Sequence, residues 1–112
     1  IILLKLATTW CPTCKQQVEE IADIGSFLQE RDVALLEVFF QDTEAMLQDH
    51  QKATNYPMSH HVLQGDNKVA KAYNLYVIPR LLVIDRDFKV RRDGSLISAY
   101  DLKRLVGELA TP

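Results

Sequence analysis

The chain has 112 residues, of which 47% are hydrophobic and 25% charged, and its formal net charge is −2. A chain of this length buries one hydrophobic core, so we expect a single domain over residues 1–112. The slightly acidic balance argues against a nucleic-acid partner, and the basic segment 89–92 is short enough to be an ordinary solvated strand. No apolar run reaches about 18 residues, so we expect no membrane insertion by this domain.

The N-terminal residues Ile1-Ile2-Leu3-Leu4 indicate a buried strand that starts abruptly. No signal peptide is visible in this sequence. We therefore expect that an N-terminal segment is missing here, and that it could carry an export signal or a membrane anchor.

The first third of the chain predicts a strand, a loop and a long helix. Residues 1–7 form an apolar run rich in branched side chains and interrupted by Lys5, as in a buried strand. A loop over residues 8–10 follows, and Pro12 suits the first turn of a helix, where its missing N–H is not needed. Apolar side chains at helical spacing extend this helix over residues 13–31, and Gly25 inside it marks close packing or a kink.

The rest of the chain alternates further strands and helices, bounded by capping and turn residues. In chain order these are a strand over 33–40, a helix from Asp42 or Thr43 to Ala53, an irregular segment over 54–64, a helix over 67–73 capped by Asp66, strands over 81–85 and 89–92 joined by Arg86-Asp87, a turn at Asp93-Gly94, and a helix from Ser98 to about Leu109. Parallel strands joined by helices, followed by a hairpin, predict an α/β fold with a central mixed sheet flanked by helices on both faces.

The two cysteines, Cys11 and Cys14, lie three positions apart at the start of the long helix. A disulfide across so short a loop gains little as a structural cross-link, which leaves redox chemistry or metal binding. The unpaired N–H groups and the positive dipole end of a helix N-terminus favour a thiolate at Cys11. We therefore predict that Cys11 attacks a partner disulfide and that the more shielded Cys14 resolves the mixed disulfide.

Zinc is the alternative to redox chemistry at this motif. A structural zinc site needs two further ligands, and the chain has no third cysteine. The adjacent His60 and His61 would rarely both reach one metal ion. We therefore expect no metal at the cysteines.

The segment 7–15, which contains Cys11-Pro12-Thr13-Cys14, resembles the active site of the thioredoxin superfamily, and most closely its TlpA/ResA-like branch, including the CcmG/DsbE type of cytochrome c maturation. Residues 69–79 are similar to the segment of that branch that ends in proline, and residues 82–87 are similar to its hairpin. The resemblance covers nearly the whole chain and implies a thioredoxin fold.

The resemblance also implies roles for several residues around the cysteines. Pro79 would be the cis-proline that faces the disulfide, and Ile78 before it would offer backbone groups to an extended substrate segment. Trp10 would cover the disulfide. Arg80 departs from the family, which has a small or polar residue there. It could stabilise the Cys11 thiolate or steer acidic partners, or it is merely solvated.

A second departure concerns two charges beneath the motif. Thioredoxins bury an aspartate six residues before the first cysteine, with a lysine facing it on the next central strand. This chain has Lys5 at the first position and, by alignment, Glu37 at the second. Burying one charge alone is costly, so we expect the two to pair and one of them to relay a proton to Cys14. The alternative is that Lys5 extends outward to solvent.

The histidines and the remaining alternatives carry weaker signals. We expect His50 to be solvated on a polar helix face, and His60 and His61 to lie in the irregular segment. A copper site there is disfavoured, because copper-delivery relatives typically use a CxxxC spacing. A peroxiredoxin is also disfavoured, because residues 5–10 lack the proline of the peroxidatic motif.

Together these features predict a thiol–disulfide oxidoreductase that needs no cofactor beyond a redox-active Cys11–Cys14 disulfide. The expected partners are protein thiols or disulfides and an upstream thiol–disulfide electron donor or acceptor, and we expect a monomer. The resemblance implies a place in cytochrome c maturation or extracytoplasmic protein reduction, in the bacterial periplasm or on the extracytoplasmic face of the membrane. The alternative function is a copper or apoprotein chaperone that uses the dithiol to hold its ligand.

Overall fold

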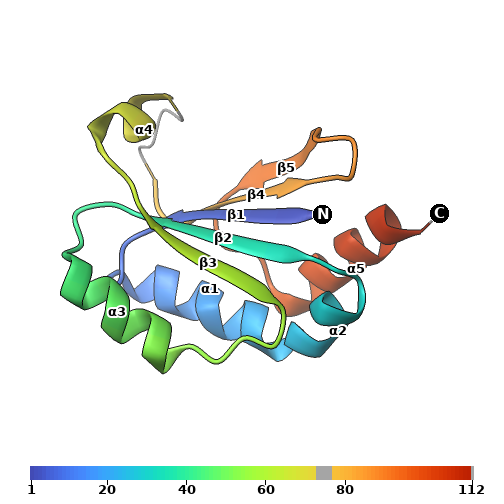
Figure 1. Ribbon diagram of the computed structural model, residues 1–112. Coiled ribbons are helices and arrows are strands. Elements are labelled where there is room, and N and C mark those ends of the chain that lie inside the picture. The colour runs from blue at the N-terminus through green and yellow to red at the C-terminus, as the bar shows by residue number, and fades with distance from the viewer. Residues whose placement is uncertain (73–76, 112) are drawn as a thin grey trace.

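A computed structural model describes residues 1–72 and 77–111. Its sheet has five strands, in the order β3-β2-β1-β4-β5 (Figure 1). Strands β1, β2 and β3 are parallel, and β4 and β5 are antiparallel to their neighbours, which confirms the predicted mixed sheet. The strand bounds are β1 Ile2–Ala7, β2 Ala34–Phe39, β3 Ser59–Gln64, β4 Arg80–Ile84 and β5 Val90–Gly94.

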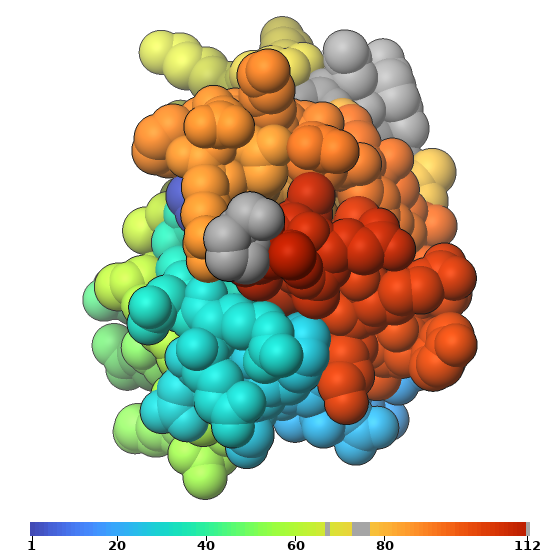
Figure 2. Space-filling view, turned by 90° about the vertical axis from the view of Figure 1, so that its right-hand side faces the viewer, coloured from blue at the N-terminus to red at the C-terminus, as the bar shows by residue number. Residues whose placement is uncertain are grey.

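Helices cover both faces of this sheet, as predicted, but unequally. The helix bounds are α1 Pro12–Asp23, α2 Gly25–Glu30, α3 Glu44–Ala53, α4 Asn67–Ala72 and α5 Ala99–Ala110. Figure 1 shows α1, α2, α3 and α5 on one face and the short α4 on the other. Figure 2 views the end where β1 begins and shows α5 lying between the β4–β5 hairpin and α2.

The alternation of side chains along the central strands divides the core into two layers. Leu3 of β1 and Leu35 of β2 point to the face of α1 and α5, where they form the larger buried cluster with Ile21, Leu28, Leu81, Val83, Leu102 and Val106. Leu6 and Val38 point to the other face and pack with Leu4, Phe40 and Leu82. Lys5 and Glu37 share the face of Leu3 and Leu35, and therefore lie beneath α1.

The predicted long helix over 13–31 is two helices, because the chain bends at Ile24 (φ −112°, ψ 21°). Gly25 begins the second helix in close contact with Pro57: a Cβ added at Gly25 would lie 2.8 Å from the Cδ of that proline. Both expectations for Gly25, close packing and a kink, are therefore met at one position.

The prediction of an irregular segment over 54–64 is wrong for its second half, which forms the edge strand β3. Its sequence Ser-His-His-Val-Leu-Gln is too polar to signal a buried strand, yet an edge strand needs only alternate inward side chains. His60 and Val62 are the partly buried positions. The turn predicted at Asp93-Gly94 is also wrong, since both residues belong to β5.

Other predicted boundaries hold closely. Thr43 caps α3 and Ser98 caps α5 through their hydroxyl groups. Asp66 caps α4, accepting from the N–H of Val69 at 3.0 Å; the predicted end of this helix at Tyr73 lies outside the described residues. Among the described residues, no helix is long and apolar enough to span a bilayer.

Helix α1 is fixed to the loop before α5 by a buried amide. The Gln17 side chain donates to the carbonyl of Ile97 at 3.1 Å and accepts from its N–H at 2.9 Å. Gln17 is fully buried, so both hydrogen bonds are shielded from water. This contact joins the helix that carries the cysteines to a segment 80 residues away in sequence.

Candidate active site

The two cysteines lie at the N-terminus of α1, where β1 ends and the chain turns. Cys11 is the N-cap, and its Sγ accepts a hydrogen bond from the N–H of Cys14 at 3.3 Å. Pro12 occupies the first helical turn, as predicted. Both cysteines are free thiols, Cys11 with 8% of its surface exposed and Cys14 with 1%. Both residues are therefore buried, and Cys11 at the helix N-terminus is the more exposed of the two.

Cys14 is held as a neutral thiol by its surroundings. Burial raises the pKa of Cys14 to about 12, and the interaction with Cys11 adds to this rise. The positive charge of Lys5 acts in the opposite direction but does not cancel it. Cys14 therefore needs a proton acceptor before it can act as a nucleophile near neutral pH.

The loop before the cysteines is attached to the next loop of the sheet through Asp42. Thr9 donates to the Asp42 carboxylate from its N–H at 3.1 Å and from its hydroxyl at 2.6 Å. Because Thr43 caps α3, Asp42 is free for this second role. The sequence offered Asp42 only as a helix cap and gave no signal of this contact, which spans 33 residues.

The segment before β4 completes the surroundings of the cysteines. The Ile78–Pro79 peptide bond is cis, as predicted, and Pro79 is buried. Ile78 packs against a buried cluster that contains both cysteines, together with Ala7, Phe39 and Leu47. Trp10 is 54% exposed and Val77 is 65% exposed. Thr13 is also exposed.

Arg80 forms an ion pair with Asp93. It is therefore not merely solvated, which was one of the expected alternatives. Its guanidinium donates two hydrogen bonds to the carboxylate of Asp93 on β5, one from Nε at 2.7 Å. Hydrogen bonding to Arg80 lowers the pKa of Asp93 below its usual value. The pair links the two strands of the hairpin.

The predicted charge pair beneath α1 is present. Lys5 and Glu37 are direct partners in the parallel register of β1 and β2, and the Lys5 Nζ lies 2.9 Å from the Glu37 Oε2. Both residues are fully buried, which rules out the alternative of a solvated Lys5. The Nζ also lies 5.7 Å from the ring centre of Phe39.

Two histidines join this pair, contrary to expectation. His50 on α3 and His60 on β3 both bring Nε2 to the Oε1 of Glu37, His50 at 3.1 Å. His50 is therefore not a solvated surface residue. One available signal was its position three residues after Leu47, the buried residue of α3, which places both on one helix face. His61 points elsewhere and contacts the hydroxyl of Ser59.

The carboxylate of Glu37 stays ionised within this cluster. Burial raises the pKa of Glu37, but the hydrogen bonds from His50 and His60 and the charge of Lys5 outweigh burial and hold it far below its usual range. Burial, reinforced by the negative charge of Glu37, raises the pKa of the nearby Tyr56 hydroxyl.

A pocket of about 280 Å³ lies behind Cys14, between α1 and α3. Lys5, Thr8, Cys14 and His50 are among the residues that line it.

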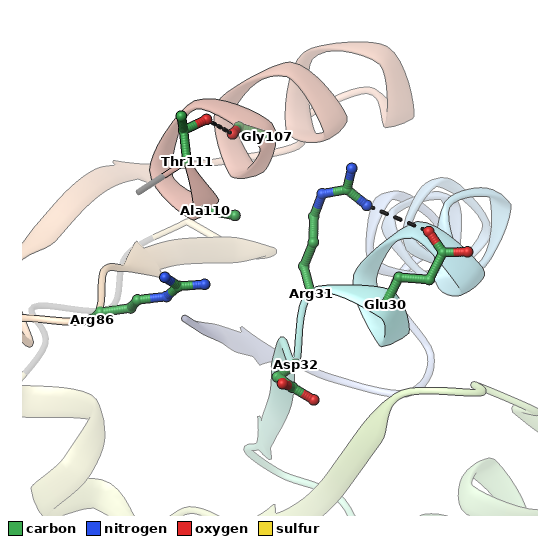
Figure 3. Close-up of a pocket in the computed structure, with 7 residues that line it drawn as sticks. All are labelled: Glu30, Arg31, Asp32, Arg86, Gly107, Ala110 and Thr111. Atoms are coloured by element: carbon green, nitrogen blue, oxygen red, sulfur yellow. Dashed lines mark hydrogen bonds and ion pairs between the residues drawn. The ribbon is translucent and has the colours of Figure 1, made fainter.

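A larger, polar depression of about 510 Å³ lies near the end of α5, lined from the α2–β2 turn, the hairpin and α5 (Figure 3). Figure 3 shows Arg31 reaching toward Glu30 there, at 3.6 Å, and neither cysteine lines this depression.

Metal ligands do not gather in the described part of the chain. Over residues 1–72 and 77–111, no group of three or more His, Cys, Asp or Glu side chains is arranged to hold a metal ion. His60 contacts Glu37 instead of the cysteines. The copper-site alternative therefore gains no support from the geometry.

Comparison with solved structures shows that the chain has a thioredoxin-like fold. A thiol:disulfide interchange protein of the thioredoxin family from Chlorobium tepidum matches with a TM-score of 0.82 and 18% identity, over 98% of this chain and 79% of that one. The exposed lipoprotein thioredoxin Etrx1 of Streptococcus pneumoniae matches with a TM-score of 0.73 and 20% identity, over 96% and 84%. A secreted disulfide oxidoreductase of Mycobacterium tuberculosis, homologous to DsbE of E. coli, matches with a TM-score of 0.76 and 17% identity, over 96% and 81%.

The structure therefore combines a thioredoxin-like fold with a CxxC site at the start of its first helix. A search of curated proteins found no significant match. The chain belongs to the AhpC/TSA family, whose match over residues 1–93 includes the cysteines, the charge pair and the hairpin up to Asp93.

Proposed function

We propose that this domain is a thiol–disulfide oxidoreductase that exchanges disulfides with partner proteins through Cys11 and Cys14. The observation that carries the proposal is the contrast between the two sulfurs. Cys11 lies at a helix N-terminus and is partly accessible, whereas Cys14 is sealed and protonated. One sulfur can meet a partner, and the other is kept for an internal attack.

The proposed reaction, written for reduction of a partner, has two exchanges. The Cys11 thiolate attacks one sulfur of the partner disulfide, and the other partner sulfur leaves as a thiolate and takes up a proton. Cys14 then loses its proton and attacks the Cys11 sulfur. The Cys11–Cys14 bond forms, the bond to the partner breaks, and two electrons have passed to the partner. Oxidation of a partner is the same sequence in reverse, and the two thiols are the only redox groups it needs.

We propose that partner segments dock beside Cys11, on the surface made by Trp10, Pro12, Thr13 and residues 77–79. Trp10 and Val77 are large exposed apolar side chains next to the site. Ile78 packs against the buried cluster that contains both cysteines. Such a surface suits an extended, apolar stretch of a partner protein around its cysteine.

We further propose that the domain acts in extracytoplasmic protein reduction or cytochrome c maturation. A separate thiol–disulfide protein would be its electron donor or acceptor. The support for this assignment is the resemblance to the CcmG/DsbE type, together with structural neighbours described as a secreted oxidoreductase and an exposed lipoprotein. We propose that the domain acts there as a monomer.

We also propose that Lys5 and Glu37 assist removal of the proton from Cys14. The Lys5 charge favours the Cys14 thiolate, and Lys5 lines the pocket behind that sulfur. Glu37 holds the Lys5 ammonium in place at 2.9 Å. The pair would therefore lower the barrier to the second exchange without touching the partner.

Trapping of partners tests the proposal. The Cys14→Ser variant should accumulate mixed disulfides with partner proteins, because Cys11 attacks but nothing resolves the product. The Cys11→Ser variant is the matched control and should accumulate none. Trapping by Cys11→Ser equal to that by Cys14→Ser would contradict the assignment of the two roles.

A further inference from the structure

The second exchange requires a group that accepts the proton of Cys14. The Lys5–Glu37 pair is poorly suited to accept it. Both oxygens of Glu37 already accept hydrogen bonds, Oε2 from Lys5 and Oε1 from the two histidines. Glu37 is not among the residues that line the pocket behind Cys14. Lys5 is itself a hydrogen-bond donor in the pair. The proton acceptor must therefore be a different group that reaches the pocket.

His50 lines this pocket, and it is largely buried there, whereas the carboxylate of Glu19 in the same lining is exposed. The ring lines the same pocket as Cys14 and Lys5, and it is only 12% exposed. Because an ionised carboxylate can only accept, the contact with Glu37 places the imidazole proton on Nε2. In the neutral ring, Nδ1 then carries the free lone pair, and it makes no hydrogen bond to a described residue. Glu37 thus orients His50 as a base.

Thr8 supplies an independent sign that a polar molecule belongs in this pocket. Its side chain lines the pocket, the residue is 3% exposed, and Oγ1 has no hydrogen-bond partner in the described chain. Buried hydroxyl groups are nearly always satisfied by protein or by ordered water. A pocket with a hydroxyl, an ammonium and an imidazole has enough polar partners to hold water.

We propose that His50 is the proton acceptor for Cys14, through water held at Thr8 in this pocket. The proposal rests on the proposed thiol–disulfide exchange and names the base that serves its second step. The Cys14 proton moves to water, and a proton of that water moves to the Nδ1 of His50, which becomes an imidazolium. The Cys14 thiolate attacks the Cys11 sulfur, and the partner sulfur leaves with the electron pair of the broken bond. His50 later returns its proton to solvent at the pocket mouth.

The charges around His50 suit this role. Glu37 on β2 faces Nε2 and stabilises the imidazolium, while Lys5 on β1 opposes it and favours the thiolate. His60 on β3 donates to the same oxygen of Glu37. Lys15 and Glu19 on α1 also line the pocket and are exposed, so their opposite charges face water.

The test is stopped-flow release of thionitrobenzoate from its symmetrical aromatic disulfide by the reduced protein. The first equivalent reports attack by Cys11 and depends on reagent concentration; the second reports resolution by Cys14 and does not. In the wild type the second rate should rise with pH through one inflection and then level off, as general-base catalysis requires. In His50→Gln the second rate near pH 7 should fall by about 100-fold and lose the inflection, while the first rate changes little.

Two further variants keep the test decisive. Thr8→Val has the same shape without the hydroxyl and should slow the second phase alone. His60→Gln is the matched control: it also removes a hydrogen bond to the Oε1 of Glu37, but its ring does not line the pocket, so the inflection should remain. A second phase in His50→Gln within about tenfold of the wild type, or with its inflection intact, overturns the inference. Equal slowing by His60→Gln and His50→Gln overturns it as well.

Failure of the proposed function would look different. A wild type without a concentration-independent second phase, or a second phase that persists in Cys14→Ser, would overturn the exchange mechanism and this inference together. A second phase that depends on Cys14, but whose rate is unchanged in His50→Gln and Thr8→Val, would overturn only the inference. Circular dichroism of each variant, compared with the wild type, establishes that the fold is unchanged.

Discussion

Removing the two members of the buried charge pair should have unequal effects on stability. Glu37 accepts hydrogen bonds from Lys5, His50 and His60. Lys5, by contrast, donates its hydrogen bond to Glu37. After Lys5→Met, the carboxylate still has two histidine donors. After Glu37→Gln, the Lys5 ammonium is left fully buried beside a neutral amide and the Phe39 ring.

These contacts set the expected magnitudes. Removing one partner of a buried pair typically costs about 3–5 kcal/mol, and we expect that range for Glu37→Gln. For Lys5→Met we expect about 2 kcal/mol, since histidine donors remain and the methionine side chain fills much of the lysine volume. The double variant should cost less than the sum of the two, by about 1–3 kcal/mol, because neither charge is then left alone.

Urea denaturation of the reduced proteins near pH 7 measures these differences in the free energy of unfolding. Lys15→Met is the control, because this lysine is exposed and its loss should change stability by no more than about 0.5 kcal/mol. The reasoning is refuted if the single effects add to within about 0.5 kcal/mol, or if Lys5→Met is the more damaging variant.

Three further outcomes are expected. Gly25→Ala should destabilise the fold by about 1–3 kcal/mol in a thermal or urea melt, since the new methyl group would lie 2.8 Å from Pro57; an unchanged or raised stability would show that this contact yields freely. Because the folded-state pKa of Glu37 is depressed, its stabilisation is present above its ordinary value of 4.5 and is lost as the pH falls below that value. The acid limb of the stability curve should accordingly be shallower in Glu37→Gln than in the wild type, and parallel limbs would contradict this. Iodoacetamide should alkylate Cys11 well before Cys14 in the reduced protein, as followed by peptide mass spectrometry; equal rates would mean that the burial of Cys14 does not protect it.

The charge pair was predictable because it depends on regular structure. Lys5 and Glu37 each interrupt an apolar run, and two adjacent central strands of equal length bring them into register. The positions of Cys11 and Pro12 followed from helix capping in the same way. Local patterns with a fixed period were therefore enough to predict the register of the central strands and the residues of the first helical turn.

The histidine contacts were not predictable by that route. His60 reaches Glu37 only because residues 59–64 join the sheet edge, and a polar edge strand has no apolar run to reveal it. His50 depends on which face α3 presents, a choice that Leu47 alone signals weakly. Asp42 and Thr8 belong to loops, whose contacts are set by the packing of distant elements.

The buried amide of Gln17 bears on how the molecule would accommodate a change of oxidation state. Gln17 follows Cys14 by one helical turn, and its side chain is held as both donor and acceptor by Ile97. The body of α1 is thereby held to the loop before α5, on the same face of the sheet. Strain from closing the Cys11–Cys14 bond would be taken up upstream of the helix, in residues 8–11, where it alters the surface shown to partners. The oxidised and reduced proteins would then differ in recognition while their helical frameworks superimpose.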